Sequence, residues 1–218
     1  MAPYRFNHRS FALTPDCRQR SLRAMRPRAW VLLVVDIGIK VGLVALLGLA
    51  LVFPDLPQFA GKAMQGRVLT YGLAMLLVPA IWFFRFRRHP YPVVIDILIT
   101  LPFFIDVAGN ALDLYDTIEW WDDANHFVNW GLLTGGVALA LAFLPLGRLN
   151  RFGLAVGYAA LSAIMWELAE YVTFIKDSPE LATAYTDTLF DEILGTAGGT
   201  VAAALVAWFV PPRSGTGG

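Results

Sequence analysis

The sequence holds a single cysteine, few charged residues and no excess of charge of either sign. Cys17 stands alone, which excludes an intrachain disulfide and any C-x-x-C metal or redox motif. Charged residues make up 16% of the chain, against about 25% in soluble domains. Because 17 basic residues balance 17 acidic ones, the chain lacks the basic excess typical of nucleic-acid binding, and we expect no nucleic-acid partner.

Apolar residues dominate instead, at 57% of the chain with a mean hydropathy of +0.56. They form six runs near the roughly 20 residues that a helix needs to cross a bilayer, and no alternating strand pattern appears. The runs cover about residues 29–53, 68–84, 93–111, 123–146, 152–175 and 188–210. The sequence therefore predicts an all-α, polytopic membrane bundle of six transmembrane helices over residues 29–210, with a basic cytoplasmic tail at 1–28 and a disordered tail at 211–218.

The distribution of Lys and Arg predicts the orientation, because positive residues are retained on the cytoplasmic side. With both termini cytoplasmic, the inner segments hold 13 basic residues and the outer loops hold only Lys62, Arg67 and Lys176. The remaining basic residue, Lys40, falls inside the first run four residues after Asp36, so the two are expected to pair on one helix face. We predict that the N- and C-termini are both cytoplasmic.

Acidic residues and a histidine interrupt the last three runs at a common depth, near their predicted outer ends. Two residues in each run are spaced i,i+3 or i,i+4, which lets both side chains point the same way. The pairs are Asp122 with His126, Glu167 with Glu170, and Asp187 with Asp191. Asp106 and Asn110 bring the third run to the same level. Behind Asp191, the small residues at 195–199 allow a neighbouring helix to approach closely.

The predicted third to sixth helices hold no Lys or Arg to neutralise these acids. Ionised carboxylates cannot crowd a low-dielectric layer, so some must be protonated, hydrated or bound to a cation. Carboxylates with an imidazole suit Mg²⁺, Mn²⁺, Ca²⁺ or Zn²⁺. We therefore expect a divalent metal on Asp122, His126, Glu167, Glu170 and Asp191, with these five and Asp187 as the catalytic candidates.

Simpler structural roles compete for several of these residues. Asp122, Asp123 and Asp187 stand at helix starts, where acids stabilise the first turn without any further function. Trp130 and Trp166 fit interfacial anchoring or packing. Glu167 and Glu170 resist such readings, because they lie inside an apolar helix.

Three motifs in order resemble the YjdF-like family of bacterial membrane proteins, which is similar to the VanZ-like group. They are WDDANHF at 121–127, WELAEY at 166–171 and TDTLFDEILG at 186–195. The family pattern places an Asp four residues before His-Phe, a Glu pair on the next helix and an Asp-Thr-x-x-Asp run on the last. The resemblance covers about residues 120–204 and implies a multi-pass protein of the bacterial inner membrane. Association of the VanZ-like group with glycopeptide resistance implies a role at the cell envelope.

Three functions are compatible with these features. The first is a divalent-cation-dependent enzyme acting on a lipid or cell-envelope substrate. The second is a proton- or cation-coupled transporter that uses the same carboxylates as a relay. The third is a structural membrane partner in which the polar layer holds helices together. The sequence leaves open whether the protein is an enzyme, but it predicts contact with membrane lipid in every case.

Overall fold

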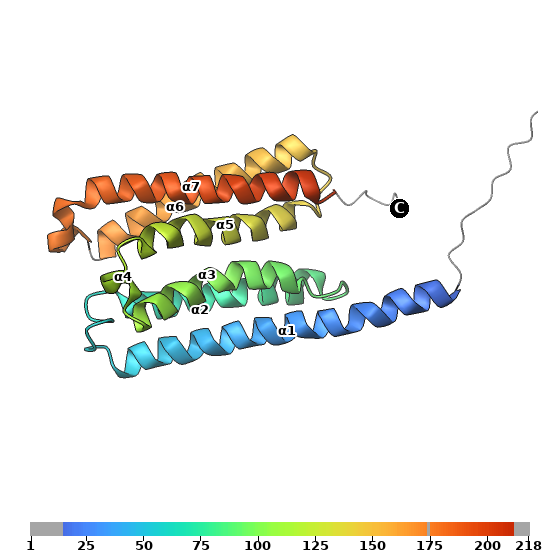
Figure 1. Ribbon diagram of the computed structural model, residues 1–218, viewed down its shortest axis with the longest axis horizontal. Coiled ribbons are helices and arrows are strands. Elements are labelled where there is room, and N and C mark those ends of the chain that lie inside the picture. The colour runs from blue at the N-terminus through green and yellow to red at the C-terminus, as the bar shows by residue number, and fades with distance from the viewer. Residues whose placement is uncertain (1–14, 174, 212–218) are drawn as a thin grey trace, which may run out of the picture.

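The computed structural model describes residues 15–173 and 175–211, which form helices and connecting loops without any strand (Figure 1). Six helices in these residues are long: α1 (Pro15–Val52), α2 (Met64–Ile81), α3 (Val93–Ala111), α5 (Trp121–Leu141), α6 (Arg148–Thr173) and α7 (Ala184–Phe209). The shorter elements are the π-helical turn η1 (Trp82–Phe86), α4 (Leu114–Thr117) and the 3₁₀ turns η2 (Ile175–Asp177) and η3 (Pro179–Ala182). The all-α prediction is confirmed.

Among the described residues, five helical segments are long and apolar enough to cross a membrane. They are Ala29–Val52, Met64–Phe86, Val93–Ala111, Arg148–Asp177 and Ala184–Phe209. The remaining long helix, α5, is of similar length, but its first half carries Asp122, Asp123, Asn125, His126 and Asn129. Three of these five side chains are buried, so α5 is polar toward the protein interior. That α5 is the sixth crossing stays a prediction.

Several helix ends differ from the predicted runs, because hydropathy marks where the apolar residues stop, whereas the helix ends where its backbone hydrogen bonding ends. α2 begins at Met64, ahead of Arg67; α5 ends at Leu141 rather than 146; and α7 begins at Ala184 rather than 188. α1 begins at Pro15, inside the predicted basic tail. Residues 1–14 of that tail and residues 212–218 of the predicted disordered tail lie outside the described residues.

The helices form two groups of three that meet along α3 and α5 (Figure 1). In the first group α1 and α2 pack on α3, and in the second α5 and α6 pack on α7, with α5 and α7 in the most extensive contact. The start of α1, the α2–α3 loop, the α5–α6 loop and the end of α7 lie at one end of the bundle. The α4 linker and the start of α7 lie at the opposite end.

Small residues make α7 the central helix of its group. A Cβ atom on Gly198 would collide with the backbone carbonyl of Phe127 in α5. One on Gly199 would collide with the Cβ of Ala159 in α6 and would lie 2.8 Å from the hydroxyl of Thr134. The run at 195–199 therefore lets α5 and α6 approach the backbone of α7, as the sequence predicted.

Gly198→Ala is expected to destabilise the protein by about 1–3 kcal/mol, because the added methyl must displace the α5 backbone rather than a flexible side chain. The matched control is Gly157→Ala in α6, where an added Cβ meets nothing within 4 Å. The control should be neutral or stabilising, since alanine is the better helix former. Thermal unfolding in detergent, followed by circular dichroism, compares the two. Equal melting temperatures would contradict the close α5–α7 packing.

Candidate functional site

A cavity of about 830 Å³ lies among α2, α3, α5, α6, α7 and the α4 linker. Its volume falls within the roughly 300–1,000 Å³ of small-molecule sites. All six candidate residues from the sequence line it: Asp122, His126, Glu167, Glu170, Asp187 and Asp191. Asp106 and Asn110 of α3 line it as well, so the expected convergence of polar residues from four helices is found.

Three of the six candidates bring potential metal ligands together. The Nε2 atom of His126 lies 3.7 Å from a carboxylate oxygen of Asp122 and 3.7 Å from one of Asp191. One ligand atom from each of these residues falls within 4.8 Å of the other two. His126 and Asp191 are buried, and Asp122 is partly exposed. One nitrogen and two carboxylate oxygens therefore converge between α5 and α7.

Glu167 faces the other side of the His126 ring. Its Oε1 atom lies 3.8 Å from Nδ1 of His126, and neither atom has a hydrogen-bond partner among the described residues. The Oε2 atom accepts a hydrogen bond from Thr188 at 3.1 Å, which holds the carboxylate in place. Both Glu167 and His126 are buried. Nε2 of His126 thus faces Asp122 and Asp191, whereas Nδ1 faces Glu167.

Trp130 holds the His126 ring in this orientation. The two rings stack almost in parallel, with centroids 5.4 Å apart and an interplanar angle of 3°. The indole nitrogen of Trp130 donates to the hydroxyl of Ser162 at 3.1 Å, and Trp166 packs across the indole at 6.0 Å. Trp130 and Trp166 both line the cavity, so they shape its wall in addition to packing.

Arg67 partly neutralises the cavity, which corrects the expectation that it lies in an outer loop. Because α2 begins at Met64, Arg67 lies in its first turn and reaches the carboxylate of Asp106, with which it forms a hydrogen-bonded ion pair. Its guanidinium also lies 3.8 Å from a carboxylate oxygen of Glu170. Glu170 therefore faces a cation of the protein rather than the group around His126.

Two tyrosines also donate hydrogen bonds to Asp106. The hydroxyl of Tyr71 donates to one carboxylate oxygen at 2.6 Å, and the hydroxyl of Tyr115, in the α4 linker, donates to the other at 2.9 Å. Burial raises the pKa of Tyr115 above its ordinary value, and the nearby negative charge of Asp106 adds to the increase. The Tyr115 hydroxyl therefore keeps its proton and remains a donor, which ties the linker to α3.

The remaining acids of this region are not part of the three-residue cluster of Asp122, His126 and Asp191. Asp187 lines the cavity but is exposed, one helical turn before Asp191. Asp123 is exposed and Glu192 is partly buried, and neither lines the cavity. Their positions fit first-turn acids of α5 and α7 or surface residues better than ligands.

Comparison with known proteins assigns the family. The model of a family described as a predicted membrane protein (DUF2238) matches residues 39–211. The chain belongs to this family. Searches of curated proteins and of solved structures each returned no match. The matched range includes every residue of the cavity, and a multi-pass membrane protein agrees with the apolar helices described above.

Several residues that line the cavity were not identified as candidates from the sequence. Arg67, Tyr71 and Tyr115 surround Asp106, while Asn125 and Asn129 line the α5 side next to His126. The asparagines follow Asp122 and His126 at i+3, which places them on the same face of α5. That periodicity was a usable signal for the asparagines, whereas the partners of Asp106 come from distant segments.

Proposed function

We propose that the protein is an integral membrane enzyme that binds a divalent cation at Asp122, His126 and Asp191 and uses it on a lipid or cell-envelope substrate. The observation that carries the proposal is the convergence of three ligand-type atoms within 4.8 Å of one another. Three protein ligands with the remaining positions left to water or substrate is the usual arrangement of a catalytic metal.

The surroundings of His126 support a specific division of roles. Nε2 is the ligand atom, since it faces Asp122 and Asp191. Nδ1 carries the proton and donates to Glu167 once the 3.8 Å separation shortens to the roughly 2.7–3.2 Å of an N–H···O hydrogen bond. A carboxylate behind a metal-bound histidine fixes the tautomer and the ring orientation. Glu167 is then a positioning residue rather than a ligand.

The charge of the cavity supports a bound cation. Eight carboxylates line it, against the two cations Lys62 and Arg67. Arg67 is paired with Asp106 and Glu170, and Lys62 is paired with Asp116. The acids around His126 are therefore left without a basic partner among the described residues. A divalent ion offsets this excess; the imidazole favours Zn²⁺ over the oxygen-preferring Mg²⁺ and Ca²⁺, and the carboxylates also suit Mn²⁺.

The mixed polar and apolar lining of the cavity supports an amphiphilic substrate. Its walls combine these acids with Phe103, Leu133, Trp130 and Trp166, so a polar group at the metal can be accompanied by an apolar part. A bound ion can polarise a phosphoryl or acyl oxygen and can activate water for attack on it. Membrane lipids and lipid-linked envelope precursors combine such groups with apolar chains.

The proposed topology places the cavity at the outer face of a bacterial inner membrane, with both termini cytoplasmic. The segment between α2 and α3 lies at the end of the bundle that also holds the start of α1 and the end of α7 (Figure 1), and its sequence contains Arg85, Arg87 and Arg88. Reporters fused after Arg88 and at the C-terminus should read as cytoplasmic, whereas a reporter in the loop at 113–119 should read as external. An external C-terminus would contradict this orientation.

Metal analysis of the purified protein tests the proposal. Wild-type protein dialysed against Zn²⁺ or Mn²⁺ and then passed through a desalting column should retain about one ion per chain. Asp191→Asn should retain less than about a tenth of that amount, because it removes one of three ligands. The matched control is Asp123→Asn, which changes an exposed acid next to Asp122. Equal retention by all three proteins, or none by the wild type, would refute the site.

A proton- or cation-coupled transporter is the second candidate. The observation that favours it is a further charged group, formed by Asp36, Lys40 and Asp96, on α1 and α3. Asp96 precedes Asp106 by ten residues, which corresponds to about 15 Å along α3. Charged groups at two depths are what a relay across the membrane requires.

A further inference from the structure

Asp36 lies in a buried ion-pair cluster that is separate from the cavity. Lys40 lies one turn further along α1, and its Nζ atom is 3.1 Å from Oδ2 of Asp36. The same ammonium forms an ion pair with Asp96 of α3. Asp36 is 3% exposed and Asp96 is fully buried. Two carboxylates therefore share one cation inside the apolar part of the bundle.

The carboxylates of Asp36 and Asp96 differ in the number of hydrogen bonds that they accept. Asp96 accepts hydrogen bonds from Lys40 and Tyr91 on one oxygen and from Thr100 on the other, at 3.3 Å. Asp36 receives only Lys40, and its Oδ1 atom has no hydrogen-bond partner among the described residues. Because buried charge is stable only when paired and hydrogen-bonded, Asp96 is the ionised member.

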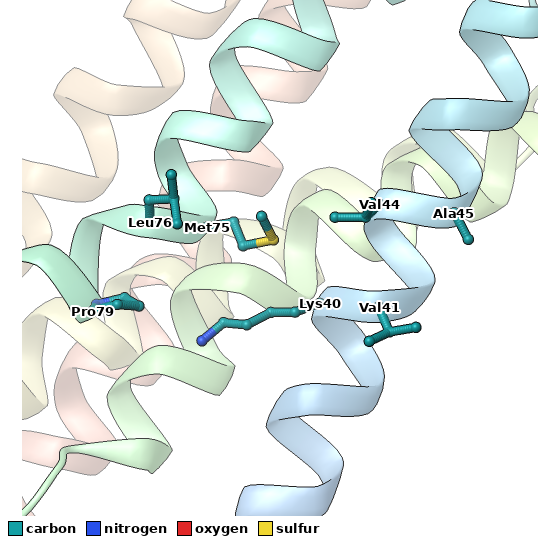
Figure 2. A pocket seen from close by; sticks show the side chains of 7 residues that line it. All are labelled: Lys40, Val41, Val44, Ala45, Met75, Leu76 and Pro79. Atoms are coloured by element: carbon teal, nitrogen blue, oxygen red, sulfur yellow. The ribbon is translucent and has the colours of Figure 1, made fainter.

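The neighbouring pocket supplies nothing that could neutralise Asp36. This pocket of about 420 Å³ lies between α1 and α2, and its other walls are Val41, Val44, Ala45, Met75, Leu76 and Pro79. Figure 2 shows Lys40 extending from α1 in the direction of Pro79, and the other labelled side chains around it are apolar. With both aspartates ionised, the cluster would hold one uncompensated negative charge in this apolar setting.

We propose that Asp36 is a proton-binding site within the membrane, at which Oδ1 takes up a proton from water and releases it again. The O–H bond forms on the carboxylate oxygen that has no partner, while Oδ2 continues to accept from Lys40. The cluster then carries one positive and one negative charge. A metal ion fits poorly, because a single free oxygen offers too few ligands and the other oxygen of the same carboxylate is already bound to the Lys40 ammonium.

Melting temperatures in detergent at neutral pH test which aspartate is neutral. Asp36→Asn replaces a protonated carboxyl by a neutral group of the same shape and should change the melting temperature by less than about 2 °C. Asp96→Asn removes the ionised partner of Lys40 and should lower it by about 10 °C. A loss with Asp36→Asn as large as that with Asp96→Asn, or failure of Asp36→Asn to fold, overturns the proposal.

Infrared spectroscopy tests the proton itself. The wild-type protein should show the carbonyl band of a protonated carboxyl group near neutral pH, and the band should weaken as the pH is raised. Asp36→Asn should lower the intensity of the band by the contribution of one carboxyl group, whereas Asp55→Asn, a change of an exposed acid in the α1–α2 loop, should leave it unchanged. A band of unchanged intensity in Asp36→Asn would assign the proton to another residue and refute the site.

Discussion

Zn²⁺ or Mn²⁺ at a hundredfold excess over its dissociation constant is expected to raise the melting temperature of the detergent-purified protein by about 5–10 °C. An ion that binds only the folded protein raises its free energy of unfolding by about 2.7 kcal/mol at that excess. For a chain of 218 residues, 1 kcal/mol corresponds to about 2–4 °C. The acids around His126 repel one another without the ion, which makes the folded state especially sensitive to it.

Substitution of the histidine should abolish this stabilisation. In His126→Asn the imidazole ligand is lost, so the melting temperature should be the same with chelator and with metal. Asp123→Asn should keep the full shift, because Asp123 is exposed and does not line the cavity. Differential scanning fluorimetry in each condition gives the comparison. A shift that persists in His126→Asn would place the bound ion elsewhere.

Glu167→Gln is expected to weaken metal binding by about 10–100-fold while leaving all three ligands in place. The amide cannot stabilise the protonated Nδ1 of His126 as a carboxylate does, so the ring is less well fixed and Nε2 is a poorer ligand. Isothermal titration calorimetry with Zn²⁺, on protein that has been stripped of metal, measures the affinity.

The adjacent acid of α6 supplies the control for that measurement. Glu170 lies one helical turn after Glu167 but faces Arg67, 3.8 Å away. Glu170→Gln should therefore change the affinity much less than Glu167→Gln. If Glu170→Gln weakens binding equally, the effect is one of overall cavity charge, and the specific role of Glu167 is wrong.

The fold class and the convergence of the candidate residues could be predicted from the sequence, because both depend on periodicity and hydropathy. Asp122 and His126 are one turn apart, and so are Asp187 and Asp191, so their side chains had to share a face of each helix. The alternation of loop charge fixed which helix ends should meet. These signals lie within single segments of the sequence, so they can be read without knowing how the helices pack.

The partners of the acids could not be predicted in this way. Arg67 appeared to lie in a loop, because hydropathy alone excludes the first turn of α2, and its pairing with Asp106 depends on how α2 packs on α3. Arg151 falls just before the predicted run at 152–175 and so belongs to a predicted loop, yet it is buried and donates to the carbonyls of Ala207 and Val210 at the end of α7. A cation at a helix C-terminus is stabilising there, but no sequence spacing indicates it.

The division of roles between Glu167 and Glu170 also required the structure. Both lie inside the apolar helix α6 and both were expected to bind metal. Although their spacing of three residues puts them on the same side of the helix, Glu167 faces His126 and Glu170 faces Arg67. Which neighbour each meets is decided by α2 and α5, which are distant in sequence.

X-ray absorption at the zinc edge of Zn²⁺-loaded protein reports which atoms are bound to the ion. The wild type should show one imidazole nitrogen together with carboxylate oxygens, and His126→Asn should lose the imidazole contribution. Asp123→Asn should give the wild-type spectrum. A coordination shell without imidazole in the wild type, or one that is unchanged in His126→Asn, would contradict a metal site at Asp122, His126 and Asp191.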